Sequence, residues 1–231
     1  MPCTDQEMRS AVEQLLDEFR SSADLSYKSF NTKLKVSCYP DSILGIRMPV
    51  VRRIAHKLSK YLTSDGAITL LYPLAERWYE YKLLLGLVLK EVTQEDEVGK
   101  TIPVLYSLCD GWAVSDLYQE VLGYFAQMGH LEEVLLSTKE FSSNTNEFAR
   151  RLSIVVYFPL LRNRLVDIEQ VLEHIALLEY DAAYYVEMAN AWLLAEIKLT
   201  HPEVTLVISN PSLSKRYRQK LRESLRHSNK L

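Results

Sequence analysis

The sequence predicts an all-α fold, because it is rich in a good helix former and poor in the residues that make tight turns between strands. Leucine contributes 37 of the 231 residues, whereas glycine contributes 7 and proline 8. Leucine favours helices, and tight β-hairpin turns depend on glycine. Amphipathic segments with helical spacing follow one another along the chain, with no turn-bounded run of alternating apolar and polar residues between them.

The first helix is predicted close to the N-terminus. Thr4 and Glu7 have the spacing of a capping box, in which two side chains satisfy free backbone amides at the start of a helix. Behind this box, apolar residues recur at helical spacing. These residues are Met8, Val12, Leu15, Leu16 and Phe19.

A second helix is predicted from Pro49, because proline fits the first turn of a helix without wasting an amide. Its buried face consists of Val51, Ile54, Leu58 and Leu62. Similar stripes predict four further helices: Leu117, Val121, Leu122 and Phe125; Phe148, Leu152 and Val155; Ile168, Val171, Leu172 and Ile175; Val186, Ala189, Leu193 and Ile197.

Short connections separate these helices, and each contains residues typical of turns or caps. They are Ser64-Asp65-Gly66, Gly129-His130, Ser142-Ser143-Asn144, Asp181 and Asn210-Pro211. Because one helical hairpin cannot bury both of its faces alone, successive hairpins are expected to stack on their neighbours. No break in composition divides the chain. We therefore expect residues 1–231 to form a single domain, a curved α-solenoid of HEAT-like helical-hairpin repeats.

The spacing of unusual residues supports a repeat. Trp112, Arg151 and Trp192 are separated by 39 and 41 residues, close to the roughly 40–47 residues of a HEAT-type repeat. If the period holds, the three residues occupy equivalent positions along their helices and face the same side of the stack. Each also lies at the margin of an apolar stripe, where a side chain can reach a concave surface.

Composition and patterning exclude several classes of protein. Hydrophobic residues make up 48% and charged residues 25%, as in ordinary globular proteins. The longest apolar stretch, near residues 82–90, is far shorter than the roughly 20 residues needed to cross a bilayer. The N-terminal residues show no apolar run of a secretory signal, and the three cysteines form no close pair. We therefore expect a cytoplasmic protein that has no disulfides. We do not expect an integral membrane protein.

Positive charge is concentrated in two stretches, although the net charge of the chain is −3. Residues 42–64 contain five Lys or Arg and no acid. Residues 211–231 contain seven Lys or Arg and one acid, so the rest of the chain carries a net charge of −9. A basic helix at this end could contact phosphates or could simply keep the surface soluble.

One set of residues has the chemistry of a binding cleft for a cation. Trp112 and Asp116 are four residues apart and share one helical face. Taken singly, each of these residues, like Arg151 or Trp192, is more often structural than functional. Together they provide two indole faces and a carboxylate that attract a cation, and a guanidinium that can hold a phosphate. Such a cleft suits a cationic nucleobase in DNA.

The sequence contains no motif that supports metal binding, nucleotide binding or a serine nucleophile. We therefore expect no metal and no cofactor. Gly99-Lys100-Thr101 resembles the end of a phosphate-binding loop, but Gln94 stands where that loop requires glycine. The five histidines lack metal-ligand spacing, and no G-x-S-x-G motif is present.

Several motifs, in order and spacing, resemble those of the AlkD-type DNA glycosylases, the HEAT-like-repeat proteins of alkylation repair, from about Leu44 to the C-terminus. No single motif is specific. The matching segments are Leu44-Gly45-Ile46-Arg47-Met48-Pro49-Val50-Val51-Arg52, Tyr79-Glu80-Tyr81-Lys82, Trp112-x-x-x-Asp116, Glu147-Phe148-Ala149-Arg150-Arg151, Ala191-Trp192-Leu193-Leu194 and Thr200-His201-Pro202-Glu203-Val204.

The resemblance implies a protein that holds duplex DNA in its concave face and removes N3- or N7-alkylated purines without a base pocket. In that family pattern, Trp112 and Trp192 would contact the deoxyribose and the cationic lesion. Asp116 would stabilise the oxocarbenium-like sugar and position water, and Arg151 would grip a phosphate. The residues expected to bind DNA elsewhere are Arg47, Arg52, Lys215, Arg218 and Arg222.

One segment departs from the family pattern. The family carries a short lesion-facing helix just before its LGI segment, whereas residues 31–43 here contain Pro40, which pushes Tyr39 out of helical geometry, and Val36-Ser37-Cys38, which favours a helix poorly. This departure predicts weak or absent excision of simple methylated bases. The alternative function is a non-catalytic helical-repeat protein that binds DNA structure or a protein partner.

Overall fold

The computed structural model describes residues 5–228, and within them every regular element is a helix. The α-helices are α1 (Asp5–Ser21), α2 (Leu25–Leu34), α3 (Met48–Leu58), α4 (Ser64–Arg77), α5 (Tyr79–Val92), α6 (Val98–Ser107), α7 (Trp112–Phe125), α8 (Leu131–Phe141), α9 (Glu147–Val155), α10 (Tyr157–Arg162), α11 (Ile168–Leu177), α12 (Tyr184–Thr200) and α13 (Pro211–Ser228). Short helical turns lie at η1 (Pro40–Ser42), η2 (Glu95–Glu97) and η3 (Ala126–His130).

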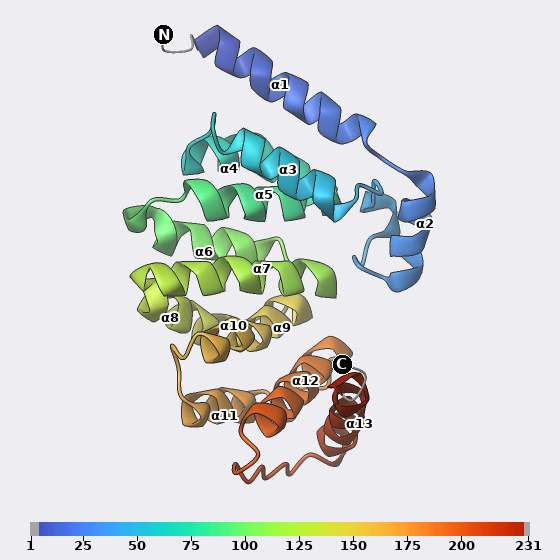
Figure 1. Ribbon diagram of the computed structural model, residues 1–231, viewed down its shortest axis with the longest axis vertical. Helices are drawn as coiled ribbons and strands as arrows, with labels where there is room; N and C mark the ends of the chain where they lie inside the picture. The colour runs from blue at the N-terminus through green and yellow to red at the C-terminus, as the bar shows by residue number, and fades with distance from the viewer. Residues whose placement is uncertain (1–4, 229–231) are drawn as a thin grey trace.

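The helices are stacked along the long axis of the molecule in chain order (Figure 1). Five of them, α3, α5, α7, α9 and α12, each pack on the next and form what we call the central stack. Helix α1 packs on the α3 end of the stack, and α13 packs on α12 at the other end. Helices α4 and α8 pack against the central stack from a second layer, in which α6 contacts α8.

The apolar interior is one contiguous cluster that runs from α1 to α13. Helix α5 lies at its centre, and every residue of α5 from Tyr79 to Leu89 is buried. Such a helix has no solvent face, unlike the striped helices around it, and its burial includes the charged side chains of Glu80 and Lys82. The buried layer fixes α5 between α3 and α7, the helix that carries the first site residues.

A loop between α2 and α3 is held tightly against the central stack. The Glu80 carboxylate at the start of α5 accepts hydrogen bonds from the backbone amides of Leu44, Gly45 and Ile46, at 2.8, 2.7 and 3.2 Å. Gly111, directly before α7, lies so close to this loop that a Cβ there would stand 2.1 Å from the carbonyl oxygen of Val36. These contacts position the first turn of α7.

The structure confirms each predicted helix, with changes at some ends. The helix predicted from Pro49 ends at Leu58 instead of reaching Leu62. Ser64-Asp65-Gly66 was expected to be a turn, but it begins α4, because the Thr63 side chain caps the Gly66 amide. The turn at Gly129 is confirmed by its left-handed backbone, with φ at +105°. The predicted capping residue Thr4 lies outside the described residues.

The segment that departs from the family pattern is non-helical where the sequence predicts it. Helix α2 ends at Leu34, Lys35 adopts a left-handed conformation, and only the short turn η1 interrupts the loop that follows. Helix α2 itself was not predicted. Among the helices of residues 5–228, none is both long enough and apolar enough to cross a membrane.

Candidate active site

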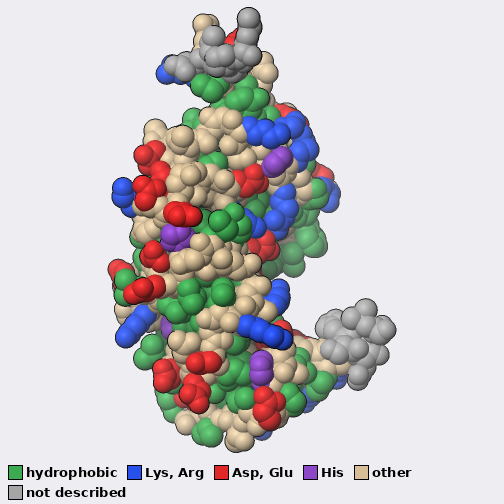
Figure 2. All heavy atoms as spheres, turned by 60° about the vertical axis from the view of Figure 1, so that its left-hand side comes forward, with side chains coloured by type: hydrophobic (Ala, Val, Ile, Leu, Met, Phe, Trp, Pro, Cys, Tyr) green, Lys and Arg blue, Asp and Glu red, His purple; other side chains and the backbone are tan. Residues whose placement is uncertain are grey.

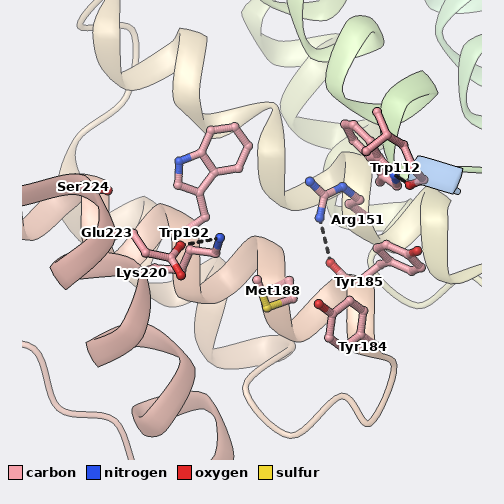
Figure 3. Close-up of a pocket in the computed structure, with 10 residues that line it drawn as sticks. Trp112, Arg151, Tyr184, Tyr185, Met188, Trp192, Lys220, Glu223 and Ser224 are labelled. Atoms are coloured by element: carbon pink, nitrogen blue, oxygen red, sulfur yellow. Dashed lines mark hydrogen bonds and ion pairs between the residues drawn. The ribbon is translucent and has the colours of Figure 1, made fainter. Parts of the chain in front are cut away.

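A pocket of about 570 Å³ opens between the last three helices of the central stack and α13. It brings together three residues expected from the sequence, Trp112 of α7, Arg151 of α9 and Trp192 of α12 (Figure 3). Its other lining residues are Leu34, Tyr184, Tyr185, Met188, Lys220, Glu223 and Ser224. Four aromatic rings therefore surround a space that also contains three charged side chains.

Trp112 is held at one end of the pocket by its own helix start and by α2. It is the first residue of α7, and the extended backbone of Gly111 turns the chain into that helix. The indole Nε1 donates a hydrogen bond to the carbonyl oxygen of Leu34, the last residue of α2, at 3.3 Å. The polar edge of the indole is thus satisfied within the protein, and its ring is left as an apolar and quadrupolar surface.

Asp116 and Arg151 form an ion pair beside Trp112. Both are the fifth residue of their helices, α7 and α9, and these helices are neighbours in the central stack. Arg151 Nε and Nη2 both donate to Asp116 Oδ1, at 3.1 and 2.8 Å, while Nη1 donates to the carbonyl oxygen of Tyr185 at 2.9 Å. Asp116 Oδ2 accepts no hydrogen bond from any residue between 5 and 228.

The electrostatics of Asp116 combine two opposing causes. Burial raises the pKa of the Asp116 carboxyl above its ordinary value, and the charge and hydrogen bonds of Arg151 lower it without cancelling the effect of burial. The Arg151 side chain is 7% exposed and that of Asp116 is 24% exposed. Arg151 lines the pocket and Asp116 is its ion-pair partner. The carboxylate is more exposed than the guanidinium but is not itself among the lining residues.

Trp192 lies at the end of the pocket away from Trp112, with Arg151 between the two indoles in Figure 3. Its ring packs on Phe158, with centroids 4.3 Å apart. The three residues were expected to occupy equivalent positions along their helices, and this expectation is wrong. Trp112 is the first residue of α7, Arg151 the fifth of α9 and Trp192 the ninth of α12. Unequal connections between the helices therefore place the three residues at different positions along their helices.

Arg47 and Arg52, expected to bind DNA, lie outside the pocket and are ion-paired. Arg47 Nη2 is 3.0 Å from Asp24 Oδ2, and its guanidinium lies over the ring of Tyr27. Arg52 Nη2 is 3.1 Å from Glu120 Oε2. Both arginine side chains are about half exposed. On the face shown in Figure 2, Lys and Arg side chains gather on one side over the N-terminal helices, and Asp and Glu predominate on the other side.

Helix α13 has two different basic faces. Lys215, Arg218 and Arg222 are exposed and do not line the pocket. Lys220 lines the pocket and pairs with Glu223 at 2.9 Å, one turn further along the helix. Arg216 forms an ion pair with Glu187 of α12, which ties the two helices together.

Sequence reasoning missed part of the pocket wall. Tyr184 and Met188 precede Trp192 at intervals of four residues on α12, so the helical spacing could have revealed that they share its face. Lys220 and Ser224 have the same spacing on α13. Their position over the pocket depends on how α13 docks on α12, which local spacing does not specify.

The described residues contain no group of three His, Cys, Asp or Glu side chains arranged to hold a metal ion. The described residues that line the pocket include one carboxylate, that of Glu223, which is hydrogen-bonded to Lys220, and the lining Arg151 is hydrogen-bonded to Asp116. The chemistry available at this site is therefore that of aromatic faces and two ion pairs.

The fold and the pocket define an all-helical protein whose stacked helices present an aromatic, charged cleft. A family model described as DNA alkylation repair enzyme matches residues 15–227, and the chain belongs to that family. The match extends over the central stack, the pocket and nearly all of α13. No curated protein and no solved structure matches the chain significantly.

Proposed function

We propose that this protein is a DNA glycosylase that excises cationic N3- or N7-alkylated purines from duplex DNA. The observation that carries this proposal is the pocket itself, which Trp112, Arg151 and Trp192 line from three helices of the central stack, with Asp116 ion-paired to Arg151. The match to the repair-enzyme family supports DNA as the substrate.

We also propose that the stacked helices form one curved solenoid domain of HEAT-like repeats with the DNA held along the central stack. Two features support this architecture. The apolar cluster is contiguous from α1 to α13, and Asp116 and Arg151 occupy the same position in neighbouring stacked helices, 35 residues apart. A repeat of that kind presents successive helices to a long ligand such as duplex DNA.

The proposed chemistry breaks the bond between the sugar C1′ and the alkylated purine nitrogen. An alkylated purine already carries a positive charge, so it leaves as a neutral base without protonation by the enzyme. The positive charge then develops on the sugar ring, where a carboxylate and aromatic faces stabilise it. Asp116 supplies that carboxylate, and Oδ2, which has no partner within residues 5–228, can orient the attacking water.

Arg151 acts in this proposal mainly as a positioning residue for Asp116. Three of its five N–H groups donate to Asp116 and to the Tyr185 carbonyl, and little of its side chain is exposed. Its charge keeps the buried carboxyl closer to its ionised form. The phosphate-gripping role that the family resemblance implies for Arg151 would have to use the remaining N–H groups.

Release of 7-methylguanine and 3-methyladenine from alkylated duplex DNA tests this function. The loop after α2 has no lesion-facing helix, so we expect slow excision, and the assay uses enzyme in excess and long time courses. Time-dependent release of either base above the spontaneous rate supports the proposal. Binding to the same DNA without release would support the alternative, a non-catalytic DNA-binding protein, because the pocket would then recognise a lesion without hydrolysing it.

A further inference from the structure

The end of the pocket beneath Trp192 is walled by α13. Lys220, Glu223 and Ser224 stand at positions i, i+3 and i+4 of this helix and therefore share one face, which is turned toward the pocket. In Figure 3 the amine of Lys220 lies next to Trp192, on the other side of the pocket from Arg151. This wall places an ammonium, the carboxylate paired with it and a hydroxyl group at the end of the pocket away from Trp112.

The other cations near the pocket are already committed. Arg151 is buried and donates to Asp116 and to the Tyr185 carbonyl. Arg216 is paired with the buried Glu187 and lies over the Tyr184 ring, 4.9 Å from its centroid. Each of these guanidinium groups therefore serves the protein's own packing.

Lys220 has more of its hydrogen-bonding capacity left. One of its three N–H donors goes to Glu223, at 2.9 Å, and the described residues offer it no second acceptor. The neighbouring Ser224 hydroxyl makes no hydrogen bond within residues 5–228. A partly exposed Lys–Glu pair on one helix contributes little stability, so an anionic ligand can share or replace it at low cost.

We propose that Lys220, assisted by the Ser224 hydroxyl, binds a backbone phosphate next to the lesion nucleotide. This inference rests on the proposed function, because it requires the damaged sugar to lie between Trp112 and Trp192. A sugar placed there carries its flanking phosphate past the Trp192 end of the pocket, toward α13. An ammonium and a hydroxyl are a suitable pair of donors for a phosphate oxygen.

The charge of Lys220 also indicates whether this residue contributes to DNA binding or to base excision. A bare ammonium in the pocket would oppose the positive charge that develops on the sugar, whereas an ammonium neutralised by phosphate would not. Lys220 should therefore contribute to binding and leave the excision rate of the bound complex nearly unchanged. Asp116 should show the opposite pattern.

The test compares Lys220→Gln with the wild-type protein on two duplexes of identical sequence, one undamaged and one with a tetrahydrofuran abasic analogue. Fluorescence anisotropy over a range of salt concentrations measures binding without any need for excision. Lys139→Gln, an exposed site on α8, is the control with the same loss of charge. Circular dichroism verifies that both variants are folded.

We expect Lys220→Gln to weaken binding of the abasic duplex about 10-fold at low salt. The slope of log K against log salt should become shallower by roughly 0.9, the value for one lost phosphate contact. Lys220→Arg should restore most of the affinity, and Lys139→Gln should change neither quantity. On alkylated DNA, the single-turnover rate at saturating enzyme should stay within about 3-fold of wild type.

Unchanged affinity and slope in Lys220→Gln, with wild-type preference for the abasic duplex intact, would overturn the inference and leave the proposed function standing. A wild-type protein with no preference for the abasic duplex would instead count against the proposed function itself, and with it the placement of the sugar. A large fall in single-turnover rate with unchanged binding would also overturn the inference, since it would place Lys220 in the chemical step.

Discussion

Glu80 is a buried carboxylate and Asp116 a partly buried one on neighbouring helices of the central stack, and the protein uses them in different ways. Both oxygens of Glu80 accept backbone amides, from Leu44 by one oxygen and from Gly45 and Ile46 by the other. Asp116 directs one oxygen to Arg151 and leaves the other without a partner in the described chain. Glu80 is fully buried, whereas the Asp116 side chain is 24% exposed.

Burial raises the pKa of both carboxyls, so a raised pKa alone does not mark the functional one. The distinguishing feature is the set of partners. A carboxylate whose lone pairs are filled by backbone amides can only hold a loop in place. A partly exposed carboxylate with one free oxygen can also act on a ligand. Substitutions at the two carboxylates test that distinction.

The largest effect is expected for Glu80→Ala. The change leaves the amides of Leu44, Gly45 and Ile46 buried without acceptors, and each such group costs about 1–3 kcal/mol. We expect the free energy of unfolding to fall by about 3 kcal/mol or more, measured by urea denaturation followed by circular dichroism. Glu132→Ala, at an exposed position of α8, should stay within about 0.5 kcal/mol of wild type. A loss below about 1 kcal/mol for Glu80→Ala would show that the loop does not depend on this carboxylate.

An intermediate effect is expected on the pH dependence of excision. The ionised form of Asp116 stabilises the sugar cation, and burial raises the pKa of Asp116, so the rate should fall on acidification with a midpoint above the usual aspartate value near 4. Arg151 lowers this pKa, so Arg151→Gln should move the midpoint to higher pH. The measurement is the single-turnover rate between pH 4 and 8. A midpoint that does not move, or moves down, would remove Arg151 from this role.

The smallest effect is expected from substitutions on the exposed face of α13, and it concerns the salt dependence of DNA binding. If Arg218 and Arg222 each contact a phosphate, replacing both by Glu should make the salt dependence of DNA binding shallower by about 1.8, at roughly 0.9 for each contact. The matched control is Lys100→Glu with Lys139→Glu, on helices α6 and α8. Equal slopes for the two double variants would limit this face of α13 to keeping the surface polar.

The sequence predicts the striped helices well because their periodicity is local. Helix α5 shows no stripe, since it is buried on every side, and only the family resemblance indicates its start at Tyr79. Helix α2 is weakly amphipathic, and its exposed Phe30 and Leu34 obscure the pattern. Helix ends also depend on capping geometry, as the start of α4 at Ser64 shows.

The sequence also predicts which residues belong to the site, but it does not predict which side chains pair with one another there. Spacing places Trp112, Arg151 and Trp192 on successive helices of one stack, as found. The ion pair between Asp116 and Arg151 depends on the register of α7 against α9, and the position of Lys220 depends on the docking of α13. Both are set by tertiary packing, which a helical period does not contain.

The most direct test of the central claim is the single-turnover rate of base release from alkylated duplex DNA by wild type and Asp116→Asn. Asparagine keeps an oxygen acceptor for Arg151 and removes the charge. We expect the rate to fall about 10²-fold or more, with DNA affinity nearly unchanged and the free energy of unfolding within about 1 kcal/mol of wild type. Glu120→Gln, one turn further along α7, should retain the wild-type rate. A rate in Asp116→Asn equal to that of wild type, or a loss of binding as large as the loss of rate, would contradict the account and make Asp116 a structural residue like Glu80.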